Sequence, residues 1–385
     1  MKTGGDWPEL GHDPLDPPVP AGGHGWLRLP RRRPMLGVRA IAAPAFVFLL
    51  LGAALGPRGL GLLSPAALGH LDIVISVALA MIGVFVGLSV SVKGSDPAGS
   101  SIAAGAMSAA VTIVTVTGGL YFLVGRWGVA LAIDPLALAC VLGICSSVSA
   151  AVHVAGDAPE ELRRAARLAD LDDVPLIVLG VTAVAMLAGG SAAERLLLTA
   201  LAGAAIGFAG WLLFERASDA AERGVFVTGA ILLLAGAASY LGTSPLLSGC
   251  VAALVWVRAP GVADRITSED LSVLQHPLVV LLLLVAGALI EWSAAVLWLA
   301  AALVLLRLVG KLLASLAIAR VARISPALLA SVLLPPGIMG IALALNVRQV
   351  LAAEDNVIVP AVTVAAVATE ILAAFLPAEQ QEEAA

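Results

Sequence analysis

The stretch Ala169–Gly180 reads ADLDDVPLIVLG and places Asp170, Asp172 and Asp173 at the start of an apolar run. The whole chain of 385 residues is 60% hydrophobic and has a mean hydropathy of +1.01, so these acids are expected at bilayer depth. A charged side chain at that depth costs at least ~2.5 kcal/mol, and it usually faces an aqueous cavity and carries ions or protons. We therefore expect a cation or proton pathway around Asp172 and Asp173.

Apolar stretches recur along the chain, each long enough to cross ~30 Å of hydrocarbon as a helix of about 20 residues. Short joints rich in Gly, Pro, Asp and Arg separate them. The pattern predicts an all-α polytopic membrane protein with about twelve transmembrane helices, of which the eighth and ninth are short. The predicted spans are 38–56, 72–92, 100–124, 134–155, 168–188, 195–215, 224–241, 245–258, 277–291, 294–318, 326–347 and 357–377.

Basic residues indicate the orientation, because short cytoplasmic loops accumulate Lys and Arg. With the N-terminus inside, the outer loops hold Arg58, Arg126, Arg195 and Arg348, and most other basic residues fall inside. We expect an integral protein of the plasma (cytoplasmic) membrane, embedded in the lipid bilayer, with both termini cytoplasmic.

The domain organisation follows from composition. Residues 1–35 are rich in Pro and Gly without apolar periodicity, which predicts a disordered cytoplasmic tail. Residues 36–377 form the transmembrane domain, and 378–385 form a short cytoplasmic tail. The net charge of -5 does not indicate a nucleic-acid partner. Three cysteines and five histidines are scattered without metal-site spacing, so we predict no cofactor.

Two segments occupy matching places in the two halves of the chain. The fourth span contains GICSSVS at 143–149, and the eleventh contains PPGIMG at 335–340. The tandem Pro335-Pro336, followed by Gly337, removes helical hydrogen bonds in mid-span and must bend or break that helix. Transporters built from inverted repeats coordinate ions with such broken helices, although proline kinks also occur in membrane helices without a transport role. We predict an inverted-repeat fold with broken helices 4 and 11.

Several stretches, in order, resemble the monovalent cation:proton antiporters, which include bacterial sodium/proton exchangers and potassium-efflux relatives. The stretch 49–63 (LLLGAALGPRGLGLL) is similar to their Gly-x-x-x-Gly-Pro-x-Gly-Leu-Gly opening, and Asp172-Asp173 resembles the Asp-Asp pair of their fifth helix. The stretches 244–254 (SPLLSGCVAAL) and 307–311 (RLVGK) resemble the segment after the seventh helix and the basic tenth helix. The Pro-Gly pair at 336–337 completes the series.

The resemblance implies a secondary active antiporter, not an enzyme, that exchanges protons for sodium or potassium by alternating access. It implies that Asp173 is the principal carrier with Asp172 as partner, and that Lys311 pairs with the first aspartate. Ser146, Ser147 and Ser149 are the polar candidates in the fourth helix, where sodium-selective members often carry Thr, Asp or Pro. Hard oxygen ligands suit sodium, lithium or potassium. A homodimer is the expected assembly.

Each of these residues also has a structural interpretation. Asp170 could funnel cations inward, and it could equally pair with Arg167 at the end of a helix. Asp172 and Asp173 could cap a helix that begins before Pro175. Lys311 is one of only three lysines, against nineteen arginines, and it could snorkel to the cytoplasmic surface, as could Arg307. Glu370 in the twelfth span could line the cavity or mark the interface.

Two rival functions remain open. An intramembrane aspartyl protease also needs paired acids, but it normally draws them from two helices, whereas Asp172 and Asp173 are neighbours. A ligand-gated potassium efflux subunit or a non-transporting sensor would share the antiporter fold. Such efflux relatives usually append a nucleotide-binding domain with a Gly-x-Gly-x-x-Gly motif, which 378–385 cannot hold.

Overall fold

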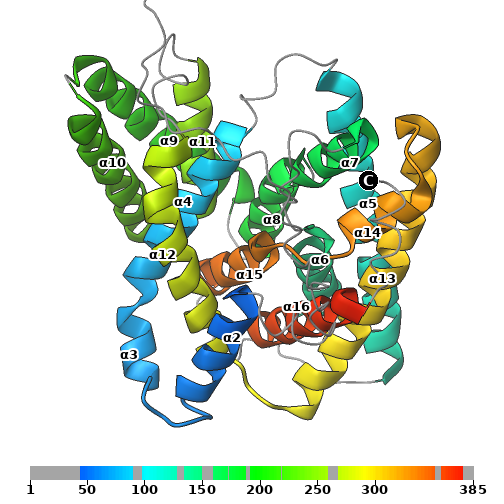
Figure 1. Cartoon of the computed structure of the whole chain (residues 1–385). Helices are drawn as coiled ribbons and strands as arrows, with labels where there is room; N and C mark the ends of the chain where they lie inside the picture. The colour runs from blue at the N-terminus through cyan, green and yellow to red at the C-terminus, as the bar shows by residue number, and fades with distance from the viewer. Residues whose placement is uncertain are drawn as a thin grey trace, which may run out of the picture. The chain divides into compact units, whose positions relative to one another are not determined.

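A computed structural model describes residues 44–89, 98–127, 134–149, 159–171, 173–187, 191–217, 219–258, 268–351 and 357–375 (Figure 1). The predicted tails at 1–35 and 378–385 lie outside these residues. The regular elements of the described part are all helices, and Ser149 and Pro336 form an isolated antiparallel bridge between two of the connecting segments. The helices are α2 (Pro44–Leu55), α3 (Pro65–His70), α4 (Asp72–Ser89), α5 (Ala98–Trp127), α6 (Pro135–Ser147), α7 (Glu160–Leu171), α8 (Asp173–Leu187), α9 (Ala192–Arg216), α10 (Ala220–Leu241), α11 (Pro245–Arg258), α12 (Ser268–Ala288), α13 (Ala294–Ala322), α14 (Pro326–Leu333), α15 (Ile338–Leu351) and α16 (Ile358–Phe375).

Several helices, among them α9 and α10, are apolar on their outward faces as well as on their packed faces. Within the described residues, α5, α9, α10 and α13 each contain a stretch long and apolar enough to cross a membrane. Large side chains such as Leu197, Leu201, Leu232 and Leu233 are more than half exposed on α9 and α10. A helix that is apolar all round, with leucines on its outer face, is suited to lipid. The chain is an integral membrane protein, as predicted.

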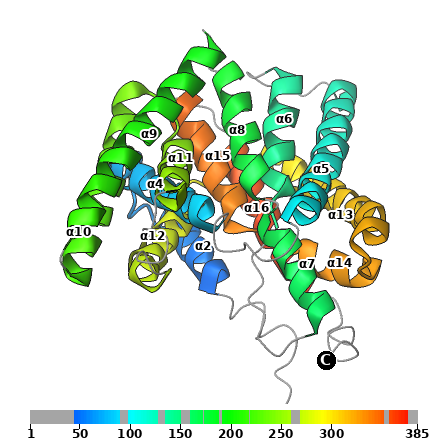
Figure 2. The ribbon, with the colours of Figure 1, turned by 90° about the horizontal axis from the view of Figure 1, so that it is seen from above.

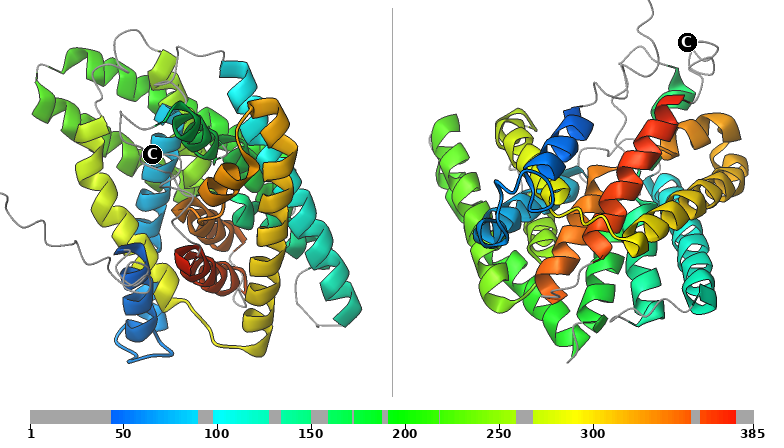
Figure 3. Two further views of the ribbon diagram at one scale, coloured as in Figure 1. Left: turned by 45° about the vertical axis from the view of Figure 1, so that its right-hand side comes forward. Right: turned by 90° about the horizontal axis from the view of Figure 1, so that it is seen from below.

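The helices pack in two groups, which lie on opposite sides in Figure 1. The panel helices are α2, α4, α9, α10, α11 and α12, in which α11 packs on α4 and α9 while α2 packs on α12. The core helices are α5, α6, α7, α8, α13, α14, α15 and α16, in which α13 packs on α5, α14 and α16. Figure 2 shows α8 between α6 and α15, and both neighbours contact it. Figure 3 shows α16 lying along α15 and reaching α13.

Glycines bring the backbones of the panel helices close together. A Cβ atom on Gly83 of α4 would lie 2.0 Å from the Leu246 carbonyl oxygen, and one on Gly249 of α11 would lie 2.1 Å from the Ala80 oxygen. Gly52 of α2 approaches the Leu284 oxygen of α12 in the same way, at 2.0 Å. Small residues at such contacts let membrane helices pack closely without a hydrophobic driving force. The glycines in two of the antiporter-like stretches therefore have a packing role.

Polar residues mark where the helices around the predicted breaks begin. The Asp134 side chain accepts a hydrogen bond from the Ala137 N–H at 3.0 Å, and Pro135 follows it as the first residue of α6. Ser325 caps α14 in the same way, with Pro326 next. Capping side chains satisfy free N–H groups of the first turn, and proline tolerates that turn because its missing donor is not needed there. The two helices thus start with the same local chemistry in the two halves of the chain.

The structure departs from some predicted boundaries. Helix α6 ends at Ser147 rather than at 155, because Val148 takes an extended conformation (ψ 134°). The fifth predicted span starts at 168, whereas α7 begins at Glu160 as an amphipathic helix and α8 begins at Asp173. The short α3 was not predicted. The helix count, the inverted repeat and the orientation in the membrane stay predictions.

Candidate functional site

Two non-helical segments cross where α6 ends and where α14 gives way to α15. The first contains Val148 and Ser149, and the second runs from Leu334 to Gly337. Ser149 and Pro336 pair as an antiparallel bridge. A Cβ atom on Gly337 would lie 2.5 Å from the Ser149 carbonyl oxygen, so only glycine allows this approach. We call the two segments together the crossing, and the tandem prolines lie within it.

Arg307 of α13 is hydrogen-bonded to both segments of the crossing. Its guanidinium is buried, with 4% of the residue exposed, and it donates to the carbonyl oxygen of Ser146. The Nη2 atom also donates to the Val148 oxygen at 2.7 Å and to the oxygens of Leu334 and Pro335, both at 3.2 Å. The last carbonyls of a helix have no partner within that helix, and they carry the negative end of its dipole. One cation therefore satisfies the carbonyl ends of both α6 and α14.

Lys311 lies one turn further along α13 and is 0% exposed. Its Nζ donates to the Ser149 hydroxyl at 2.9 Å, and that hydroxyl donates to the Leu333 carbonyl at 3.1 Å. The burial excludes the snorkelling interpretation of Lys311, because a snorkelling ammonium group reaches water. Lys311 is thus a second cation at the crossing, on a side chain that can lose its proton when buried.

The other two candidate serines point back to their own helix. Ser146 donates to the Gly143 oxygen at 3.1 Å, and Ser147 donates to the Ile144 oxygen at 2.8 Å. Both are buried in the last turn of α6. Their hydroxyl oxygens keep lone pairs, since a hydroxyl that donates one bond still accepts others. Whether they bind a cation stays a prediction.

The acids fall at the edge of the described residues. Asp172 lies outside them, and the side chains of Asp170 and Asp173 lie outside them as well. The backbone of Asp173 is the first residue of α8. Helix α8 packs on α6 and α15, and a Cβ atom on its Gly180 would lie 2.9 Å from the Leu343 side chain of α15. The helix that starts at Asp173 is therefore in contact with both halves of the chain that meet at the crossing.

A small cavity adjoins the crossing on the side of α16. Its lining includes Cys145, Arg307, Pro336 and Thr369. Glu370 follows Thr369 and is half-buried. Whether it lines the cavity or marks the interface stays a prediction.

The role of Arg307 was the main feature that sequence reasoning missed. Its acceptors are the backbone carbonyls of residues 146, 148, 334 and 335. Every residue has such a carbonyl, so the side-chain sequence does not indicate which ones accept. A usable signal existed, because an arginine inside an apolar helix needs several acceptors and two interrupted helices offer them.

Comparison with known proteins bears on the fold. No family model matches the sequence, and no curated protein matches it. Among solved structures, the sodium/proton antiporter MjNhaP1 from Methanocaldococcus jannaschii matches with a TM-score of 0.63. The match covers 88% of this chain and 91% of that one, at 16% sequence identity. The chain has the fold of a sodium/proton antiporter. The predicted fold class, an all-helical membrane protein similar to the cation:proton antiporters, is thereby confirmed.

Proposed function

We propose that this protein exchanges protons for a monovalent cation across the membrane by alternating access, with sodium as the first candidate. The observation that carries the proposal is the crossing, with two buried cations of α13 bound to its carbonyl and hydroxyl groups. The antiporter fold supports it, since the similar solved structure is a sodium/proton antiporter. Potassium is the second candidate ion.

The chemistry of exchange would rest on Asp172 and Asp173. Two adjacent carboxylates repel each other and lose hydration in a low-dielectric cleft, which favours protonation of at least one. Their titration is coupled, so the pair takes up and releases protons as a unit. A sodium ion competes with those protons for the same oxygens, and this competition is the exchange. Asp173 would be the principal carrier, because the antiporter-like order of motifs assigns it that place.

Lys311 would balance the charge at the site. When the site holds no cation, a protonated Lys311 can pair with an ionised Asp172. A cation that binds to the carboxylates repels the ammonium group, which lowers the proton affinity of Lys311. The Ser149 hydroxyl, already bound to Nζ at 2.9 Å, would keep the amine in place in both states.

Arg307 would make the crossing move as one body. It joins the ends of α6 and α14, so these helices cannot separate without leaving several carbonyls and a guanidinium without partners. Such groups are costly where no water can replace the lost bonds. The proposed motion is therefore a displacement of the core helices relative to the panel helices. In the proposed topology, the arginine-rich loops and both termini lie on the cytoplasmic side of the membrane. The proposed assembly is a homodimer.

The test is a pH-dye assay in everted vesicles from a host deficient in antiporters, with sodium, lithium and potassium added in turn. We expect cation-dependent dequenching from the unmodified protein and none from Asp173→Asn. The matched control is Asp170→Asn, which removes an acid from the last turn of α7 and should transport normally. Transport by Asp173→Asn equal to that of the unmodified protein would remove Asp173 from the site. No response to any cation would contradict antiport itself.

A further inference from the structure

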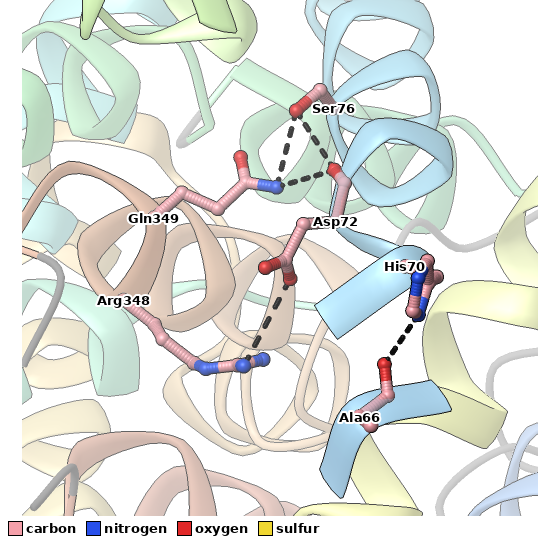
Figure 4. A network of polar contacts seen from close by, with 6 residues as sticks. All are labelled: Ala66, His70, Asp72, Ser76, Arg348 and Gln349. Atoms are coloured by element: carbon pink, nitrogen blue, oxygen red, sulfur yellow. Dashed lines mark hydrogen bonds and ion pairs between the residues drawn. The ribbon is translucent and has the colours of Figure 1, made fainter. Parts of the chain in front are cut away.

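The last turn of α15 makes a cluster of polar contacts with the start of α4 (Figure 4). Arg348 Nη2 lies 3.8 Å from the carboxylate of Asp72, the first residue of α4. The neighbouring Gln349 donates from Nε2 to the Asp72 carbonyl oxygen at 2.9 Å and to the Ser76 hydroxyl at 3.1 Å. A core helix is thus joined to a panel helix by an ion pair and by two hydrogen bonds.

The same end of α15 is linked to two further panel helices, to α10 through Ser76 of α4 and to α11 directly. The Ser76 hydroxyl accepts a hydrogen bond from Ser239 of α10 at 3.0 Å, so the contact extends to that helix. One turn earlier, the buried Asn346 accepts a hydrogen bond from Ser244, next to the start of α11, at 2.9 Å. Polar contacts of α15 with the panel helices are therefore concentrated in Asn346–Gln349, in the part of the chain that the structure describes.

These contacts stand at the far end of a helix that begins at the crossing. Helix α15 has 14 residues, so its ends are about 21 Å apart. If the core helices move relative to the panel helices, α15 transmits the motion to this end. The contacts of Arg348 and Gln349 must then break during each cycle, unless the helix pivots on them.

A second, small pocket lies beside the Ser244–Asn346 contact, between panel and core. Its lining includes Val181 of α8, Thr199 of α9, Thr243 and Val350 of α15. Val181 is eight residues beyond Asp173 on α8, which is about 12 Å along the helix axis. The cavity therefore adjoins the same helix, α8, that begins at the residue that we propose as the carrier.

Two polar atoms near this cavity are unsatisfied. One is Oγ1 of Thr243, a residue that lines the cavity, and the other is Nδ2 of Asn346, the residue that accepts the hydrogen bond of Ser244. Both atoms are buried, and neither has a hydrogen-bond partner among the described residues. Buried polar groups normally have partners, and a water molecule in this pocket could provide them. Thr243 is therefore a suitable position at which to measure solvent access.

We propose that Asp72, Arg348 and Gln349 form a latch that closes the outer access route to Asp173 and opens once in each transport cycle. Arg348 lies on the outer side in the orientation that the basic residues predict. The side chains of Asp72 and Arg348 are 47% and 23% exposed, so water and ions can replace the pair when it separates. The latch rests on the proposed function, since it closes the route that antiport would use.

Thiol labelling tests the latch without a transport measurement. The reporter is Thr243→Cys in the full chain, with Cys140, Cys145 and Cys250 replaced by Ala so that no native thiol reacts. A membrane-impermeant thiol reagent is added to intact cells. We expect slow labelling with the latch intact and labelling about three- to fivefold faster with Arg348→Gln or Asp72→Asn, because each loosens the closed state by less than about 1 kcal/mol.

The matched control uses another ion pair of the same length. Arg58 Nη2 and Glu291 lie 3.8 Å apart, both on the predicted outer side and both exposed, away from α15. Labelling of Thr243→Cys should be unchanged by Glu291→Gln. Asp72→Glu keeps a carboxylate and should keep labelling slow. If Arg348→Gln and Asp72→Asn leave the labelling rate unchanged in protein that elutes as a single peak, the latch is wrong.

Cross-linking separates a latch from a pivot. Ser76→Cys and Gln349→Cys, in the same cysteine-free chain, are joined by a short bifunctional methanethiosulfonate reagent, and cation exchange is measured before and after reduction. We expect exchange to stop on cross-linking and to return on reduction. Exchange that continues through the cross-link would mean that α15 pivots here, which overturns the latch. If the protein exchanges no cation even before cross-linking, the proposed function fails, and the labelling rates still decide whether the latch exists.

Discussion

The crossing and the latch both place charged side chains at contacts between helices, but they satisfy those charges differently. At the crossing, Arg307 is 4% exposed and donates to backbone carbonyls of two helix ends. At the latch, Arg348 faces a carboxylate that is 47% exposed, and the rest of the contact is one amide side chain. The first arrangement has no alternative partner in a membrane, whereas water can take over the second. A permanent joint and a reversible contact can therefore be distinguished by how their charges are satisfied.

The largest expected effect comes from removing the cation at the crossing. Arg307→Met leaves the carbonyls of Ser146, Val148, Leu334 and Pro335 without this donor, and because each buried acceptor left without a partner costs about 1–3 kcal/mol, we expect a total loss of at least about 3 kcal/mol in stability. Arg307→Lys should lose roughly half as much, because a single ammonium group cannot reach all four oxygens as the planar guanidinium does. Thermal unfolding in detergent micelles measures both.

The control for this prediction lies on the same helix. Arg320 is exposed near the end of α13, and Arg320→Met should change the midpoint of unfolding little. If Arg307→Met unfolds at the same temperature as the unmodified protein, the crossing does not depend on the guanidinium, and the contrast with the latch disappears.

A smaller effect is expected from filling the space at the crossing. A Cβ atom on Gly337 would lie 2.5 Å from the Ser149 oxygen, and one on Gly340 would lie 2.4 Å from the Cys145 oxygen. Both obstacles are backbone atoms, so Gly337→Ala and Gly340→Ala should each cost about 1–3 kcal/mol. Gly229→Ala and Gly236→Ala on α10 meet no atom within 4 Å, and each should gain about 0.5–1 kcal/mol from helix propensity. Equal unfolding midpoints for the two pairs would show that the crossing can relax around a methyl group.

The sequence predicted the parts of this comparison that depend on local chemistry. Tandem proline disrupts a helix in any surroundings, and the chain is non-helical between Leu333 and Ile338, within the predicted eleventh span. Lys311 stood out because lysine is rare in this chain, and it lies buried at the crossing. Hydropathy alone was enough for the all-helical membrane class.

The parts that sequence could not predict depend on partners far along the chain. Arg307 binds backbone oxygens that every residue has, so their arrangement appears only in the folded chain. Asp72 and Gln349 are 277 positions apart, and one of the acceptors of Gln349 is again a carbonyl. The stretch at 49–63 resembled an antiporter motif, but its close glycine packing against α12 became visible only from the distances. Whether Asp172 and Asp173 bind cations stays a prediction.

The smallest expected effect on stability is at the latch, and its size decides whether the latch differs from the crossing. Arg348→Gln should cost less than about 1 kcal/mol, because a partly exposed ion pair at 3.8 Å contributes little in the presence of water and salt. The unfolding midpoint should therefore stay close to that of Glu291→Gln, which removes the other 3.8 Å pair. A loss as large as that from Arg307→Met would mean that the Asp72 contact is a permanent joint like the crossing, and α15 would then have no free end to move. A small loss combined with faster labelling of Thr243→Cys is the result expected of a reversible contact, because the variant slightly weakens the closed arrangement relative to the open one and leaves the rest of the fold unchanged.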